Sequence, residues 1–179
     1  MSNIVSSVFD YVDTSPYRIV LILVYIMVLI VAAEIFAYLW HRWAHTVYSG
    51  PIHNTHQVHH TNEEDVADND FGWIVLLLLF ITGGLGLLWW VGVPQFWCLI
   101  TGLTAIIVLT VNWYVHRSYH CPDSYLRQYS WFQRWTLDHY VHHSNPEKHY
   151  GIVSCWGDRL GGTWSLCEGK RDETEERLI

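Results

Sequence analysis

The chain has 179 residues and a formal net charge of −7, and 51% of its residues are hydrophobic. Its 11 tryptophans and its aromatic share of 16% exceed those of an ordinary soluble domain. The acidic residues lie mostly in two patches, 63–70 and 172–176, and no basic stripe is present, which argues against a nucleic-acid partner. Four cysteines without a CxxC pair argue against a disulfide framework.

Three apolar runs are long enough to cross a bilayer, since a transmembrane helix needs about 20 mostly apolar residues. The first, 19–40, is interrupted only by Glu34. It is too long for a signal peptide and no basic cluster precedes it, so we expect it to remain in the mature protein. The second and third, 71–93 and 96–115, are separated by the turn VGVPQ, whose glycine and proline predict the break of a helical hairpin.

The basic residues predict the orientation of these crossings. Of the 10 lysines and arginines, only Arg18 precedes the first run, and the others follow the first or the third. Basic residues accumulate on the cytoplasmic side of membrane proteins, so the C-terminal half and every histidine are expected there. Such a site suits the endoplasmic reticulum or a bacterial inner membrane.

Ten of the 12 histidines form two HxxxH pairs and two HxxHH triplets, in the sequences HRWAH, HRSYH, HQVHH and HYVHH. Positions i, i+3 and i+4 share one face of a helix, so each motif presents its imidazoles together. Buried neutral imidazoles without partners are costly, whereas a shared cation gives each nitrogen a partner. We therefore predict that these ten residues converge on metal: His41, His45, His56, His59, His60, His116, His120, His139, His142 and His143.

Ten imidazoles are too many for one ion. They suit two six-coordinate ions with about five imidazoles each, which leaves one position on each ion for water or dioxygen. Structural zinc prefers four ligands in a tetrahedron, so the imidazole-rich set favours iron. The sequence predicts a centre of two iron ions with O2 as co-substrate, in which zinc can substitute in a purified sample.

Two polar residues inside the apolar runs are candidates for a supporting role. Glu34 lies two helical turns before His41, and Asn112 lies one turn before His116. Each is expected either to contact the ligands or a water beneath the metals, or to pair with another helix or with Tyr38.

Four further residues are weighed beside the motifs, and no catalytic residue is expected beyond the metal centre itself. Asp138 and Asp158 either orient imidazoles by accepting their second N–H or are salt-bridged surface acids. His53 and His149 lie outside the repeated motifs. We expect them to be loop or supporting histidines rather than direct ligands.

The chain resembles the fatty acid hydroxylase and sterol desaturase superfamily of integral membrane diiron enzymes over roughly residues 30–165. The resemblance rests on the four histidine motifs, the apolar hairpin between them and the ending SNPEKHYGIVSCWGDRLGGTW. That ending is similar to the family's HH, Asn-aromatic-Gly and Trp-Asp-Arg-Leu-Phe-Gly-Thr pattern. It departs at three positions: His149 stands where the family has Asn, Gly157 separates Trp from Asp, and Gly161 replaces Phe.

The resemblance implies a membrane oxygenase in which the ten histidines hold the metals. It would use O2 and external electrons to hydroxylate an unactivated C–H bond of a fatty acyl, sphingoid, sterol or carotenoid lipid, with desaturation on the same centre as the alternative. A non-enzymatic metal-binding or transport protein would instead carry ligands at mid-membrane or in a flexible loop, and a haem site needs only two facing histidines.

The electrons are expected from a separate donor of cytochrome b5, ferredoxin or reductase type, since the chain contains no HPGG, GxGxxG or ferredoxin cysteine motif.

We predict an all-α integral membrane protein with about three to four transmembrane helices capped by a cytoplasmic helical histidine-rich metal site. One membrane domain, 1–179, would comprise an N-terminal segment (1–16), a first transmembrane helix with HxxxH (17–45), a cytoplasmic HxxHH segment (46–70), a transmembrane hairpin with HxxxH (71–120) and a cytoplasmic C-terminal segment with HxxHH (121–179).

Overall fold

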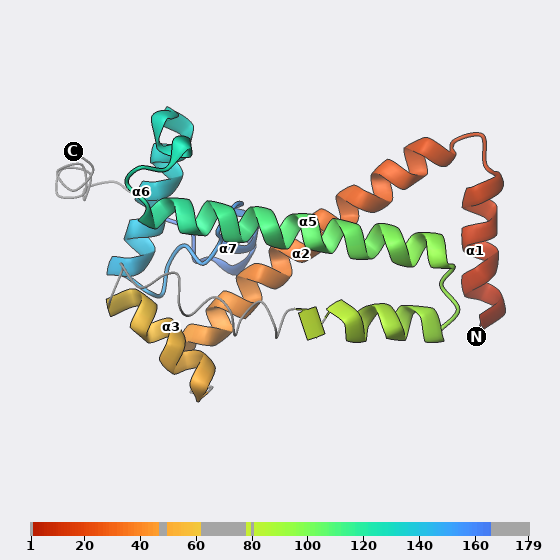
Figure 1. Cartoon of the computed structure of the whole chain (residues 1–179), viewed down its shortest axis with the longest axis horizontal. Coiled ribbons are helices and arrows are strands. Elements are labelled where there is room, and N and C mark those ends of the chain that lie inside the picture. Colours follow the sequence, from red (N-terminus) through yellow and green to blue (C-terminus); the bar gives the residue numbers. More distant parts are fainter. Residues whose placement is uncertain (1, 47–49, 62–77, 80, 166–179) are drawn as a thin grey trace. The chain divides into compact units, whose positions relative to one another are not determined.

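The computed structural model describes residues 2–46, 50–61, 78–79 and 81–165, and every regular element in this part of the chain is a helix (Figure 1). The helices are α1 (Ser2–Thr14), α2 (Arg18–Thr46), α3 (Pro51–Thr61), a short apolar helix (Ile81–Trp90), α5 (Gln95–His120), the 3₁₀ helix η1 (Tyr125–Gln128), α6 (Ser130–Ser144) and α7 (Trp156–Gly161). The all-helical prediction is confirmed.

Two of these helices contain segments long and apolar enough to cross a membrane, Arg18–His45 and Gln95–His120. The first is rich in β-branched residues, which favour strands in water, but in lipid a chain must satisfy its own backbone hydrogen bonds and so forms a helix. Apolar side chains on one face of this helix, such as Val20 and Met27, are exposed, and those on the opposite face, such as Ile26 and Ile30, are half-buried. A helix that is apolar all round suits lipid.

The predicted second crossing is described only in part, because 71–77 and residue 80 lie outside the described residues. The break that follows it forms as expected. Gly92 has a positive φ of 92°, and the Val93 amide donates to the Leu88 carbonyl at 3.0 Å, which closes the end of the preceding helix. The Pro94 carbonyl then accepts from the Trp97 amide at 3.0 Å as α5 begins.

The chain divides into two compact units. The first comprises Met1–Ala33 and Asp70–Thr110, and the second comprises Glu34–Asn69 and Val111–Ile179. Trp97, which is 2% exposed, anchors the first unit, because the rings of Phe9 and Tyr25 pack on it at centroid distances of 5.1 and 5.0 Å.

The core of the second unit joins the end of α5 to α6. Val115, Tyr119 and Phe132 are buried together, and the last two rings stack with their centroids 5.1 Å apart. This packing brings the histidines of α6 beside those at the end of α5.

Two departures from the family ending are explained by Tyr38 of α2. A Cβ atom at either Gly157 or Gly161 of α7 would overlap the Tyr38 side chain. Tyr38 is buried, and its hydroxyl accepts from Arg42 Nη1 at 3.0 Å and lies 3.3 Å from Thr163 Oγ1. The two glycines therefore provide the space in which α2 and α7 pack.

We predict that Gly161→Phe lowers the stability of the protein by about 1–3 kcal/mol, because the ring occupies the space of the Tyr38 hydroxyl. The double variant Gly161→Phe with Tyr38→Ala should lose less stability than the sum of the stability losses of the two single variants. Thermal unfolding in detergent measures both, and Leu160→Phe on the exposed side of α7 is the control. Additive losses would contradict this account of the packing.

Candidate metal centre

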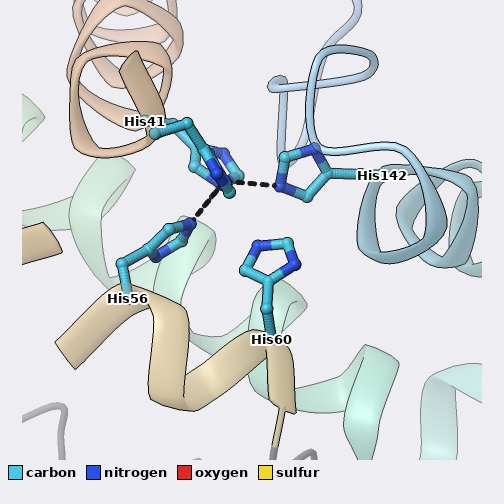
Figure 2. Close-up of side chains that lie close together, drawn as sticks. His41, His56, His60 and His142 are labelled. Carbon is cyan, nitrogen blue, oxygen red and sulfur yellow. Dashed lines mark hydrogen bonds between the residues drawn. The ribbon is translucent and has the colours of Figure 1, made fainter. Parts of the chain in front are cut away.

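Five histidines from three helices form the first group. Their donor atoms lie within 4.8 Å of one another, and Figure 2 shows rings from α2, α3 and α6 turned toward one centre. The His45 Nε2 atom lies 2.7 Å from His56 Nε2 and 3.1 Å from His142 Nε2. The members of this first group are His41, His45, His56, His60 and His142.

Four histidines form the second group, whose donor atoms also lie within 4.8 Å of one another: His59 of α3, His116 and His120 of α5, and His139 of α6. The Nε2 atoms of His120 and His139 are 2.9 Å apart. His143 lies beside both groups, because its ring stacks on that of His60 at 4.2 Å and its Nε2 is 3.1 Å from His139 Nε2. All ten histidines of the repeated motifs are thus brought together.

Two backbone carbonyls orient members of the first group. His41 Nδ1 donates to the Tyr150 carbonyl at 2.6 Å, and His142 Nδ1 donates to the Lys148 carbonyl at 2.7 Å. A carbonyl can only accept, so the ring proton is on Nδ1 in both residues and the Nε2 lone pair is directed into the group.

His149 lies between these two carbonyls in the left-handed conformation, with a φ of 54°. Asn and His adopt this region more readily than other residues with a Cβ atom. His149 therefore suits the conformation of this position, as the family's Asn would. Its Nε2 lies 3.1 Å from Ser165 Oγ, and it joins neither group.

Asp158 is neither a surface acid nor a direct partner of an imidazole among the described residues. It is 1% exposed, and its carboxylate accepts from the amides of Tyr150 and Gly151 at 2.8 and 2.7 Å and from Thr163 Oγ1 at 2.7 Å. It therefore holds the backbone whose carbonyl orients His41. Asp138 is half-buried on α6.

Glu34 and Asn112 pair with each other. Glu34 Oε1 accepts from Asn112 Nδ2 and its Oε2 accepts from Ser154 Oγ, both at 2.9 Å. The second of the two expected roles therefore applies, with Asn112 rather than Tyr38 as the partner. This cluster ties α2 and α5 to the segment after α6.

His53 also lies outside the two groups. Its Nδ1 donates to the Ala44 carbonyl at 2.8 Å, which satisfies one of the free carbonyls at the end of α2. No side-chain pattern predicted the roles of the Lys148 and Tyr150 carbonyls or of Ser154.

Burial keeps these imidazoles neutral. Outside the candidate spans, burial lowers the pKa of His59 to about 4, that of His60 to about 3 and that of His143 to about 2, and neighbouring imidazoles contribute at the last two. Burial also lowers the pKa of His56, His139 and His142. At pH 7 all six are therefore unprotonated and offer a lone pair to a cation.

The geometry of both groups fits metal ions. Two imidazole nitrogens that bind one ion at about 2.1 Å and at right angles lie about 3.0 Å apart. The separations between Nε2 atoms in the first group, 2.7–3.1 Å, match this. Among the described residues, the buried His59 Nε2 of the second group has no hydrogen-bond partner, which a cation would supply.

Helices throughout the described residues, two long apolar candidate spans and two imidazole groups able to hold metal ions are the features of a histidine-rich, membrane-associated metalloprotein. A family model described as fatty acid hydroxylase matches residues 26–163, and the chain therefore belongs to this family of membrane-bound non-haem diiron oxidoreductases. No curated protein and no solved structure matched the chain. The family confirms the expected enzyme class over the metal-transport and haem alternatives.

We predict that the metal-free protein loses stability as the pH falls below about 6.5, the pKa of an unfolded histidine. The folded-state values are lower, so the unfolded chain binds more protons between pH about 6.5 and about 4, and stability decreases as the pH decreases. Thermal unfolding in detergent with a chelator, from pH 8 to pH 5, measures this. A midpoint that stays constant over the range would refute it.

We predict that His149→Asn retains the stability of the protein, whereas His149→Val loses about 1–2 kcal/mol, because a β-branched residue resists a positive φ. Both variants remove the imidazole, so the difference between their stabilities reports the cost of the backbone conformation. Thermal unfolding midpoints measured side by side test it. Equal midpoints would show that this conformation does not limit stability.

Proposed function

We propose that this protein is a membrane diiron oxygenase that hydroxylates an unactivated C–H bond of a lipid. The observation that carries the proposal is the convergence of ten buried or half-buried imidazoles in two neighbouring groups, within a chain of the fatty acid hydroxylase family. The first ion would be held by His41, His45, His56, His60 and His142, and the second by His59, His116, His120, His139 and His143.

Bound iron would supply the redox chemistry by which O2 attacks a C–H bond. One oxygen atom enters that bond as a hydroxyl group, and the other leaves as water after taking up two electrons and two protons. We propose a separate cytochrome b5, ferredoxin or reductase as the electron donor.

The chain's own residues keep the donor atoms in place and hold water away. The carbonyls of Lys148 and Tyr150 fix two imidazole rings, and the Glu34–Asn112–Ser154 cluster ties together the segments that carry them. Burial keeps the rings uncharged, so that each can donate a lone pair to a metal ion. It also limits the entry of water to the oxidising centre.

We place the histidine side in the cytoplasm, with three to four crossings. The distribution of basic residues supports this orientation. Arg117, near the end of the candidate span of α5, lies over the exposed ring of Trp113 at 5.6 Å, an arrangement suited to a membrane–water interface.

A fatty acyl, sphingoid, sterol or carotenoid chain is the proposed substrate. An apolar groove of about 250 Å³ in the first unit, lined by side chains of α2 and α5 such as Ile26 and Ile107, supports a lipid-contacting role for these helices. Delivery from the bilayer would let the apolar tail remain in lipid.

We predict that cells expressing the protein accumulate a lipid that has gained one oxygen atom from labelled O2, and that His142→Ala lowers this product by more than about 100-fold. His53→Gln, outside both groups, should retain the product and the metal. Lipid mass spectrometry and metal analysis of the purified proteins measure both. A product that has lost two hydrogens would indicate desaturation, and identical lipid profiles would refute the oxygenase assignment.

A further inference from the structure

The two histidine groups differ in how their rings are held. In the first group, two ligand candidates from different helices donate Nδ1–H to carbonyls of one short loop, Lys148–Tyr150, which we call the carbonyl loop. Two of the three residues of this loop are buried, since His149 and Tyr150 are 4% and 2% exposed. It can therefore act as a fixed template for the rings of His41 and His142.

The second group has no such template. In the described part of the chain, no ring nitrogen of its four members bonds to a backbone carbonyl, and the bonds that they form reach only other imidazoles. Buried ring nitrogens without a hydrogen-bond partner among the described residues occur in both groups, at His120 Nδ1 and at both nitrogens of His60, so the difference between the groups lies in the carbonyl bonds. The rings of this group are placed by the spacing of three helices and by ring packing, as where Tyr119 stacks on His139 with the centroids 4.8 Å apart.

This difference bears on metal affinity. A histidine whose second nitrogen is held by a carbonyl has its tautomer and ring orientation fixed before the metal arrives, and loss of such a partner typically weakens binding by about 10–100-fold. With two of its five members held in this way, the first group is prepared for an ion, whereas the second must order its rings upon binding.

Asp158 is the residue that keeps the carbonyl loop in place. Its carboxylate accepts from the amide of Tyr150, the residue whose carbonyl orients His41, and also from the Gly151 amide and from Thr163 Oγ1. All three partners are donors, so an amide in place of the carboxylate would turn an NH2 group toward at least one N–H or O–H. No other acid is bonded to this loop among the described residues.

We propose that the two metal positions are unequal, with the first group binding its ion more tightly, and that Asp158 is the positioning residue that creates the difference. The inference rests on the proposed function in one respect, namely that both groups bind metal. It implies that the second position is the one that loads last and exchanges its ion.

The test begins with the unmodified full chain, stripped of metal by a chelator and titrated with zinc against a chromophoric competitor. Two binding steps are expected, separated by more than about 10-fold in affinity. His41→Ala should remove the tight step and His116→Ala the weak one, which assigns each step to its group. Two steps of equal affinity would overturn the proposal while leaving the proposed function intact, and absence of binding would overturn both.

Asp158→Asn should weaken the tight step by about 10–100-fold and leave the weak step and the helical circular dichroism unchanged. Asp123→Asn, at an exposed acid in the same unit, controls for the lost charge. When cobalt is bound in place of zinc, Asp158→Asn should change the visible absorption bands of the ion in the first group and leave those of the ion in the second group unchanged. Equal weakening of both steps would show a general structural role instead, and would overturn the assignment to Asp158. The titration of the unmodified chain decides the inequality even if this variant does not fold.

Discussion

A neutral imidazole has two nitrogens but only one proton, and the second unit of this protein is organised around that limit. Where Nδ1 donates to a carbonyl, as in His41 and His142, the Nε2 atom carries a lone pair that needs a partner. The Nε2 atoms of His41 and His142 lie 3.1 Å from those of His56 and His45, which are 2.7 Å apart, so whichever tautomers His45 and His56 adopt, at least one of the three contacts opposes two lone pairs or two protons. Cations resolve the conflict, because one ion accepts several lone pairs at once.

The two groups are linked because two helices contribute to both. Adjacent positions of a helix point about 100° apart, so a single HxxHH motif can serve two centres. In α3, His56 and His60 join the first group and His59 the second. In α6, His142 joins the first group and His139 the second. Neither motif completes a site by itself, and α3 and α6 together set how near the two groups lie.

The residues that depart from the family ending suit the backbone on which they lie. His149 has a positive φ, which Asn also adopts readily, and the carbonyls on either side of it reach His41 and His142. Gly157 and Gly161 give their space to Tyr38, which holds α7 close to α2. These changes alter side chains in the region that Asp158 stabilises, yet the loop that orients the rings is retained.

The sequence by itself determined the all-helical class, the two long apolar candidate spans and the helix faces that carry the histidines, because helical periodicity and apolar composition are local properties. It did not predict α1, which lies in the segment expected only as an N-terminal extension. It also separated His53 and His149 from the repeated motifs. Only the tertiary structure decided which histidine joins which group, that Glu34 pairs with Asn112, and that Asp158 acts through a loop. The His41–Tyr150 bond spans 109 positions and uses a carbonyl, a group that every residue has, so no pattern of side chains could reveal it before the chain packed.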